Sequence, residues 1–130
     1  MTRTASFAPA LLAALLLAAG CSDSTTNPDT DIIFPATGVS YAEHVQPFFN
    51  VRCATYGCHE DQTRAGSLSL TSYVTLTSRP GIVIAGSSKS SLLIQRIDGR
   101  LPHPVNVPII VNKNQLDGIM KWVDEGAKNN

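Results

Sequence analysis

The sequence predicts a small, mostly α-helical domain in which about three helices are joined by long loops. Two segments combine a helix-capping pattern with apolar residues at helical spacing, and a third has the composition of a short helix. The connecting segments are rich in glycine, serine, threonine and proline, and they give little support for strands. With 130 residues, 43% of them apolar, the chain is long enough for one such domain.

The first residues have the pattern of an export signal. Arg3 lies in a polar start, an apolar stretch runs from Ala8 to Ala19, and small residues lead into Cys21. The stretch is shorter than the roughly 20 residues that a membrane-spanning helix needs. It resembles the lipobox of bacterial lipoproteins, so we expect a signal peptide at 1–20 and a lipid anchor on Cys21. An ordinary secretory signal with an unmodified Cys21 is the alternative.

A linker is expected between the anchor and the domain. Residues 21–38 are mostly serine, threonine, asparagine, aspartate and proline, with one apolar patch at Ile32, Ile33 and Phe34. We therefore expect a flexible linker over 21–38 and a folded domain over 39–130. The formal net charge is zero and no run of Lys or Arg is present, so nucleic acid is not an expected partner.

The first helix is predicted to begin at Ser40. Ser40 and Glu43 match a capping box, in which each side chain bonds the backbone N–H of the other residue. Apolar residues follow at helical spacing through Phe49, and Pro47 should bend the helix.

Residues 53–91 are expected to be mostly loop. Ser87 or Ser88 can then cap a short helix that Gly99 ends, and a proline-rich loop follows over 101–108.

The last helix has the clearest pattern. Asn112 is its expected cap, Gln115 completes a capping box, and Gly126 ends it. Its apolar residues follow the i, i+3, i+4, i+7 spacing at Leu116, Ile119, Met120 and Val123.

Cys53, Cys58 and His59 are the residues that point to a chemistry. Two thiols can attack the two vinyl groups of a haem, and the histidine after the second thiol then lies beneath the iron. The usual spacing is C-x-x-C-H, whereas four residues separate the cysteines here, so the loop must bulge outward, helped by Gly57. Cys21 is assigned to the anchor, and no other cysteine is left over. We expect one covalent haem c, which would also complete the core of a loop-rich domain.

Two other uses of these residues stay open. A disulfide could join Cys53 and Cys58 in an exported protein. A zinc ion would find only three ligands in the segment, including His59. Glu60 and Asp61, which follow the motif, are expected to face solvent. The chain contains no motif of a hydrolase, a metalloprotease or a P-loop protein.

Four segments resemble a known family. Val45-Gln46-Pro47-Phe48-Phe49 precedes the cysteines, Ala65-Gly66-Ser67-Leu68-Ser69-Leu70 follows them, Ala85-Gly86 leads to Ser90-Ser91-Leu92-Leu93, and Lys121-Trp122-Val123-Asp124-Glu125-Gly126-Ala127 comes last. In this order they resemble the planctomycete-type cytochrome c domains and related bacterial monohaem cytochromes. The resemblance implies a small, mostly helical cytochrome c-like fold over 39–130. Apolar residues expected to pack around the haem are Phe48, Phe49, Leu68, Leu70, Leu92, Leu93, Ile97, Ile119, Met120 and Trp122.

The chain departs from this family at the second axial ligand. The family commonly has a methionine followed by proline in the loop before the tryptophan-bearing helix, whereas this chain has Leu101-Pro102-His103-Pro104. The resemblance therefore implies ligation of the iron by His59 and His103. Imidazole in place of a thioether lowers the reduction potential. A solvated His103, with His44 or Met120 as the ligand, is the alternative.

The expected function is electron transfer by a haem lipoprotein that is not an enzyme. Its partners would be redox proteins and a lipid membrane, which it reaches through the anchor. Ser22 after the lipidated cysteine, by resemblance to lipoprotein sorting, favours the periplasmic face of the outer membrane. Alternatives are a haem sensor or peroxidase-like protein with five-coordinate iron, and a haem-free lipoprotein that binds a partner through a disulfide-containing loop.

Overall fold

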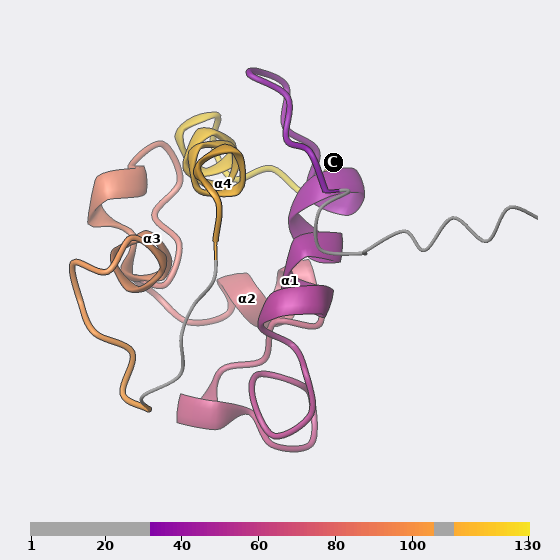
Figure 1. The fold of residues 1–130 in the computed structure, drawn as a ribbon, viewed down its shortest axis with the longest axis vertical. Helices are drawn as coiled ribbons and strands as arrows, with labels where there is room; N and C mark the ends of the chain where they lie inside the picture. The colour runs from indigo at the N-terminus through magenta and orange to yellow at the C-terminus, as the bar shows by residue number, and fades with distance from the viewer. Residues whose placement is uncertain (1–31, 106–110) are drawn as a thin grey trace, which may run out of the picture.

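The computed structural model describes residues 32–105 and 111–130. This part of the chain is helical, with short helices joined by loops and no β-strand (Figure 1). The prediction of a small, mostly α-helical domain is therefore confirmed. The expected signal peptide at 1–20, the anchor at Cys21 and most of the linker lie outside the described residues.

The first helical segment has two windings. A π-helical turn, η1 (Tyr41–Val45), continues directly into the α-helix α1 (Gln46–Arg52). Ser40 Oγ accepts the backbone N–H of Glu43 at 3.2 Å, as predicted. The N–H of Ser40, however, is bonded to His44 Nδ1 at 3.2 Å and not to Glu43, so the second half of the expected capping box is wrong. Pro47 lies in the first turn of α1, where its missing N–H costs little.

The segment after α1 contains one helix that the sequence analysis missed. Loops connect a 3₁₀ turn, η2 (Ala65–Ser67), the short helix α2 (Tyr73–Thr77) and a second 3₁₀ turn, η3 (Ser88–Ser90). Ser72 and Thr75 cap α2 reciprocally, each hydroxyl accepting the backbone N–H of the other residue at 3.2 Å. The rest of the segment is loop, as expected.

The helix α3 (Leu92–Ile97) begins after Ser91, later than predicted, because Ser87 and Ser88 start the turn η3 instead. The hydroxyl of Ser91 is fully buried; it donates to Ser87 O at 2.9 Å and accepts the N–H of Ile84 at 2.8 Å. Gly99 follows α3 in the left-handed region, with a φ of 79°, and ends the helix as predicted.

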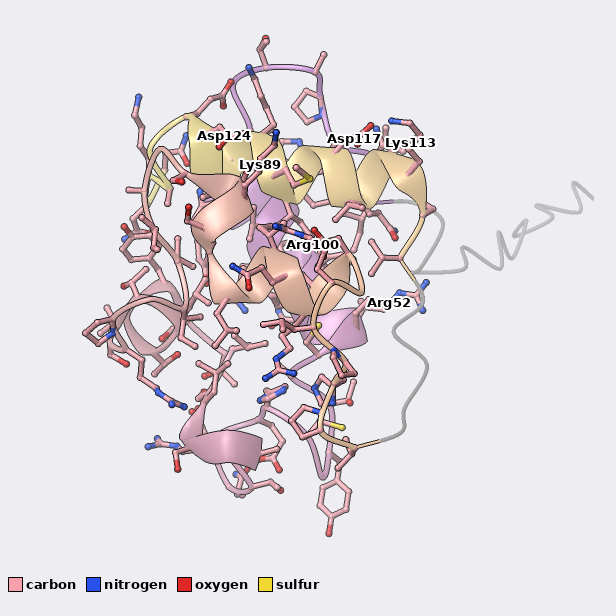
Figure 2. All side chains as sticks on the ribbon, turned by 90° about the vertical axis from the view of Figure 1, so that its left-hand side faces the viewer. Arg52, Lys89, Arg100, Lys113, Asp117 and Asp124 are labelled. Carbon is pink, nitrogen blue, oxygen red and sulfur yellow. The ribbon has the colours of Figure 1, made fainter. Side chains whose placement is uncertain are left out.

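The longest described helix is α4 (Lys113–Asp124), with 12 residues. Asn112 and Gln115 form the predicted capping box, with bonds of 2.9 and 3.2 Å, and Gly126 follows with a φ of 103°. Lys113 and Asp117 pair along its exposed side (Figure 2). Within the described residues, no helix is long and apolar enough to cross a membrane.

The core lies between α4, α3 and the η1–α1 segment (Figure 1). Its largest fully buried apolar side chains are Trp122, Phe48, Phe49, Leu76, Ile94, Ile119, Val39, Val45 and Val123. The π-helical turn also contributes an aromatic ring to the core, since the ring of Tyr41 packs against Trp122 with centroids 5.5 Å apart.

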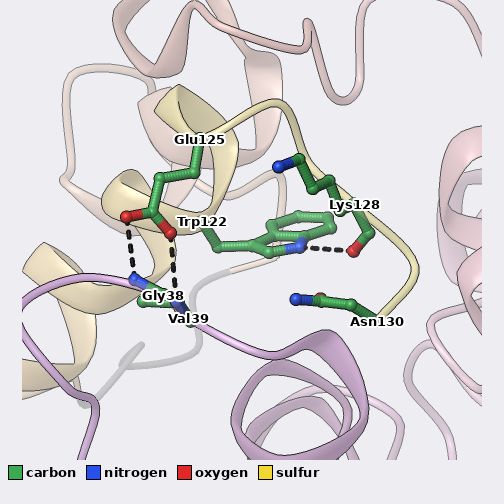
Figure 3. A pocket seen from close by; sticks show the side chains of 6 residues that line it. All are labelled: Gly38, Val39, Trp122, Glu125, Lys128 and Asn130. Carbon is green, nitrogen blue, oxygen red and sulfur yellow. Dashed lines mark hydrogen bonds between the residues drawn. The ribbon is translucent and has the colours of Figure 1, made fainter.

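The packed part of the chain begins before residue 39. Phe34 is only 3% exposed, packs against the core, and exchanges two backbone hydrogen bonds with the side chain of Asn114. The Glu125 carboxylate accepts the N–H groups of Gly38 and Val39 at 2.9 and 3.0 Å (Figure 3). The first of these bonds is the main cause that lowers the pKa of Glu125. The end of the expected linker is therefore part of the domain.

Candidate functional site

A cavity of about 460 Å³ lies between α3, the segment that follows α1, and the loop that follows α3. Figure 1 shows this last loop running from α3 down toward the segment after α1. The volume is within the range of roughly 300–1,000 Å³ of small-molecule sites. Its walls are formed by Arg52, Cys53, Gly57, Cys58, His59, Ala65, Gly66, Leu68, Leu70, Arg79, Ile82, Leu92, Leu93, Arg96, Ile97, His103, Pro104 and Val105.

The cavity brings together the four side chains assigned to the cofactor, Cys53, Cys58, His59 and His103. The two competing ligands lie elsewhere. His44 bonds Ser40 and packs on the ring of Phe34, with centroids 5.9 Å apart. Met120 is half-buried against the core. Neither lines the cavity, which leaves His103 as the histidine opposite His59.

The loop between the cysteines bulges outward. The N–H of Cys53 bonds Phe49 O at 2.8 Å and thus continues α1, and the N–H of His59 closes the loop on Cys53 O at 3.1 Å. Gly57 has a φ of 79°, which favours glycine, and Tyr56 is 96% exposed. The predicted bulge is therefore confirmed.

The cysteines at the ends of this loop are both free thiols in this structure. Burial raises the pKa of the Cys53 thiol to about 12.

His59 is held from two sides by the segment that follows it. Its Nδ1 lies 3.1 Å from Leu68 O, and its backbone oxygen accepts the N–H of Leu70 at 2.9 Å. A carbonyl oxygen only accepts hydrogen bonds, so Nδ1 is the donor, and Nε2 is left as the nitrogen that could bind a metal. This is the arrangement that prepares a histidine to bind a metal through Nε2.

His103 faces His59 across a short gap. The two ring centroids are 5.9 Å apart, and the ring planes are inclined by 76°. The Nδ1 atom of His103 is buried and has no hydrogen-bond partner among the described residues. The loop that carries it is bonded to α3 through Leu101 N–H to Gln95 O, at 2.8 Å, and through the Arg96 guanidinium to Pro102 O.

Glu60 does not face solvent, contrary to expectation. It is 9% exposed, and Oε1 accepts the N–H of Gly57 at 3.4 Å and of Thr63 at 3.0 Å. A side-chain hydrogen bond from Thr63, followed by backbone N–H groups, lowers the pKa of Glu60. The carboxylate thus joins the loop of the cysteines to the turn after His59. Asp61 is exposed as expected, although it accepts the hydroxyls of Ser69 and Thr71.

The walls differ from the predicted haem contacts in two ways. Five of the ten expected apolar residues line the cavity, namely Leu68, Leu70, Leu92, Leu93 and Ile97. The others belong to the core of the domain or pack on it. The sequence analysis also missed Arg52, Arg79 and Arg96, which line the cavity; the described wall contains no Asp or Glu. An apolar cavity with cationic side chains suits an apolar ligand that carries carboxylates.

No protein-family model, curated protein or solved structure matches this chain. In the part that the structure describes, no three His, Cys, Asp or Glu side chains are grouped so that they could hold a metal ion by themselves. The fold and cavity thus define a small, mostly helical domain with a preformed apolar site.

Proposed function

We propose that the domain binds one haem c covalently and transfers electrons. The observation that carries this proposal is the shared cavity, in which two thiols and two facing imidazoles lie among apolar side chains. Each group has a distinct use. Cys53 and Cys58 would hold the haem through its vinyl carbons, while His59 and His103 would bind its iron. The bound haem supplies the one-electron redox couple.

The spacing of the histidines supports this assignment. Two imidazole rings on opposite sides of one metal ion have centroids roughly 6 Å apart, because each metal–nitrogen bond is about 2.0 Å long and each ring adds about 1 Å. The rings of His59 and His103 are 5.9 Å apart. Only two protein ligands are needed, since a porphyrin supplies the remaining four nitrogens.

The walls of the cavity support the same ligand. Leucine and isoleucine side chains from the segment after His59 and from α3 exclude water from a flat apolar ring. Arg79 and Arg96 can offset the negative charge of two propionate groups. Because both proposed ligands are imidazoles, we expect a low reduction potential.

The test is the spectrum and mass of the mature protein made in cells that can attach haem c. We expect a c-type pyridine haemochrome and a mass increase of one haem. Cys53→Ser and Cys58→Ser should each retain one thioether, and the double variant should lose covalent haem. Tyr56→Ser, in the exposed part of the same loop, is the matched control and should bind haem as the wild type does. A colourless wild-type protein without added mass would refute the proposal.

A redox titration tests the ligand assignment separately. Replacing His103 by methionine should raise the midpoint potential, because a thioether stabilises ferrous iron more than imidazole does. His44→Gln should leave the potential unchanged, since His44 lies outside the cavity. An unchanged midpoint potential in His103→Met would mean that His103 does not bind the iron.

The membrane anchor is proposed from the sequence alone. Lipidation of Cys21 would hold the domain on the periplasmic face of a membrane, the outer one favoured, where it would exchange electrons with partner proteins. Cys21→Ser should move the protein from the membrane to the soluble fraction. A membrane-bound Cys21→Ser variant would contradict the anchor.

A further inference from the structure

The two histidines are held very differently, and we infer that His103 is an exchangeable ligand whereas His59 is a permanent one. A small neutral donor, such as carbon monoxide or imidazole, would then take the place of His103. This inference rests on the proposed function, and it adds a ligand-binding site that pure electron transfer does not need.

His59 is fixed through every part of the residue. Its ring bonds Leu68 O, its backbone N–H bonds Cys53 O, and its carbonyl accepts the N–H of Leu70. It also directly follows Cys58, whose side chain is a proposed attachment point. Displacement of His59 would therefore require several hydrogen bonds to break together.

His103 lacks an equivalent anchor for its ring. Nδ1 is the buried nitrogen, so Nε2 is the one left to bind a metal. Binding through Nε2 puts the proton on Nδ1, where the described part of the chain places no acceptor. Ligand histidines are normally oriented and made more basic by such an acceptor. His103 is therefore the weaker of the two ligands, and a buried N–H without a partner favours its release.

Arg96 is the residue that keeps His103 near the site. Its guanidinium donates to Pro102 O, the carbonyl of the peptide that joins Pro102 to His103. The second described bond between this loop and α3 comes from Leu101, one residue further away. Both attachments lie on the N-terminal side of His103. Arg96 is thus a positioning residue, acting on His103 through the backbone.

Arg100 offers a matched control. It lies in the same loop as Pro102 and has the same charge as Arg96, but its guanidinium bonds Asp98 and the Lys89 carbonyl and not Pro102; Figure 2 labels Arg100 and Lys89. Loss of Arg100 therefore removes a comparable cation and comparable hydrogen bonds without releasing Pro102.

The experiment measures the rate of carbon monoxide binding to the reduced holoprotein as a function of gas concentration. If His103 must leave first, the rate rises to a plateau that equals the dissociation rate of His103. His103→Ala should remove the plateau and give a rate that increases linearly. Arg96→Gln should raise the plateau roughly tenfold, the effect of losing one charge-assisted hydrogen bond. Arg96→Lys, which keeps the charge, should raise the plateau less than Arg96→Gln does, and Arg100→Gln should retain nearly the wild-type value.

Two results would overturn the inference. A reduced protein that keeps a bis-imidazole spectrum under saturating carbon monoxide would make His103 permanent, and the proposed function would stand. If the rate of carbon monoxide binding to the wild type increased linearly with gas concentration, as in His103→Ala, then His103 would not be a ligand. The wild-type curve decides the question even if the Arg96 variants do not fold, and absence of haem would instead refute the proposed function.

Discussion

Replacing Gly118 by alanine should destabilise the domain, although alanine favours helices by about 1 kcal/mol over glycine. Gly118 lies on the buried side of α4, and a Cβ there would be 2.2 Å from both Cβ and Cγ of Phe34. Phe34 cannot retreat easily, because Asn114 binds its backbone N–H at 2.8 Å and its carbonyl at 2.9 Å. The methyl group therefore requires Phe34 to leave its place.

The cost follows from these contacts. Overpacking costs about 1–3 kcal/mol and each lost hydrogen bond about 0.5–1.5 kcal/mol, so after the gain in helix propensity a net loss of about 2 kcal/mol remains. For a domain of this size, this corresponds to a fall in Tm of roughly 8–16 °C.

Thermal or urea unfolding followed by circular dichroism measures this effect. The matched background is Phe34→Gly, in which Gly118→Ala should become neutral or stabilising, because both the Cβ atom and the ring that clash with the new methyl group are gone. A Gly118→Ala protein that is more stable than wild type, with Phe34 intact, would refute the packing of Phe34 on α4.

Three further changes test other parts of the structure. Asn112→Ala should cost about 1 kcal/mol in urea unfolding, because it removes the cap of α4. Ser91→Ala should cost about 1–3 kcal/mol, since the two hydrogen bonds of its buried hydroxyl, with the Ile84 N–H and the Ser87 carbonyl, are lost; Ser90→Ala, at an exposed site, is its control. The lowered pKa of Glu60 means that its contribution to stability is present above about pH 4.3 and is lost as the pH falls through the lower folded-state pKa. Glu60→Gln should therefore lose less in Tm than wild type on acidification, and an equal loss would contradict this.

The ends of a helix could be predicted from the sequence where the capping pattern identifies a single residue. Asn112 and Gln115 fix the start of α4, because their spacing of three residues completes a capping box, and Gly126 fixes its end. The start of α3 was wrong because several nearby serines are all able to cap a helix. The helix α2 was missed because Tyr73–Thr77 consists of aromatic, β-branched and apolar residues, which carry no strong helical signal.

The candidate site was only partly visible in the sequence. Cys53, Cys58 and His59 are close along the chain, so their chemistry can be inferred from spacing. The bond from His59 to Leu68 and the three arginines of the cavity depend on tertiary structure, since they come from separate segments. Glu60 could have been found as a carboxylate placed to accept the N–H groups that follow it.

The buried indole of Trp122 gives the molecule an internal optical reporter. Trp122 is the only tryptophan in the chain and is 1% exposed, with its Nε1–H donating to Lys128 O at 2.9 Å (Figure 3). In a domain of this size, every interior position lies within a few nanometres of a bound chromophore, a range over which excitation energy passes from indole to porphyrin. Attachment of the proposed haem could therefore be followed as a loss of Trp122 fluorescence, and unfolding as the return of that fluorescence, with no dye attached.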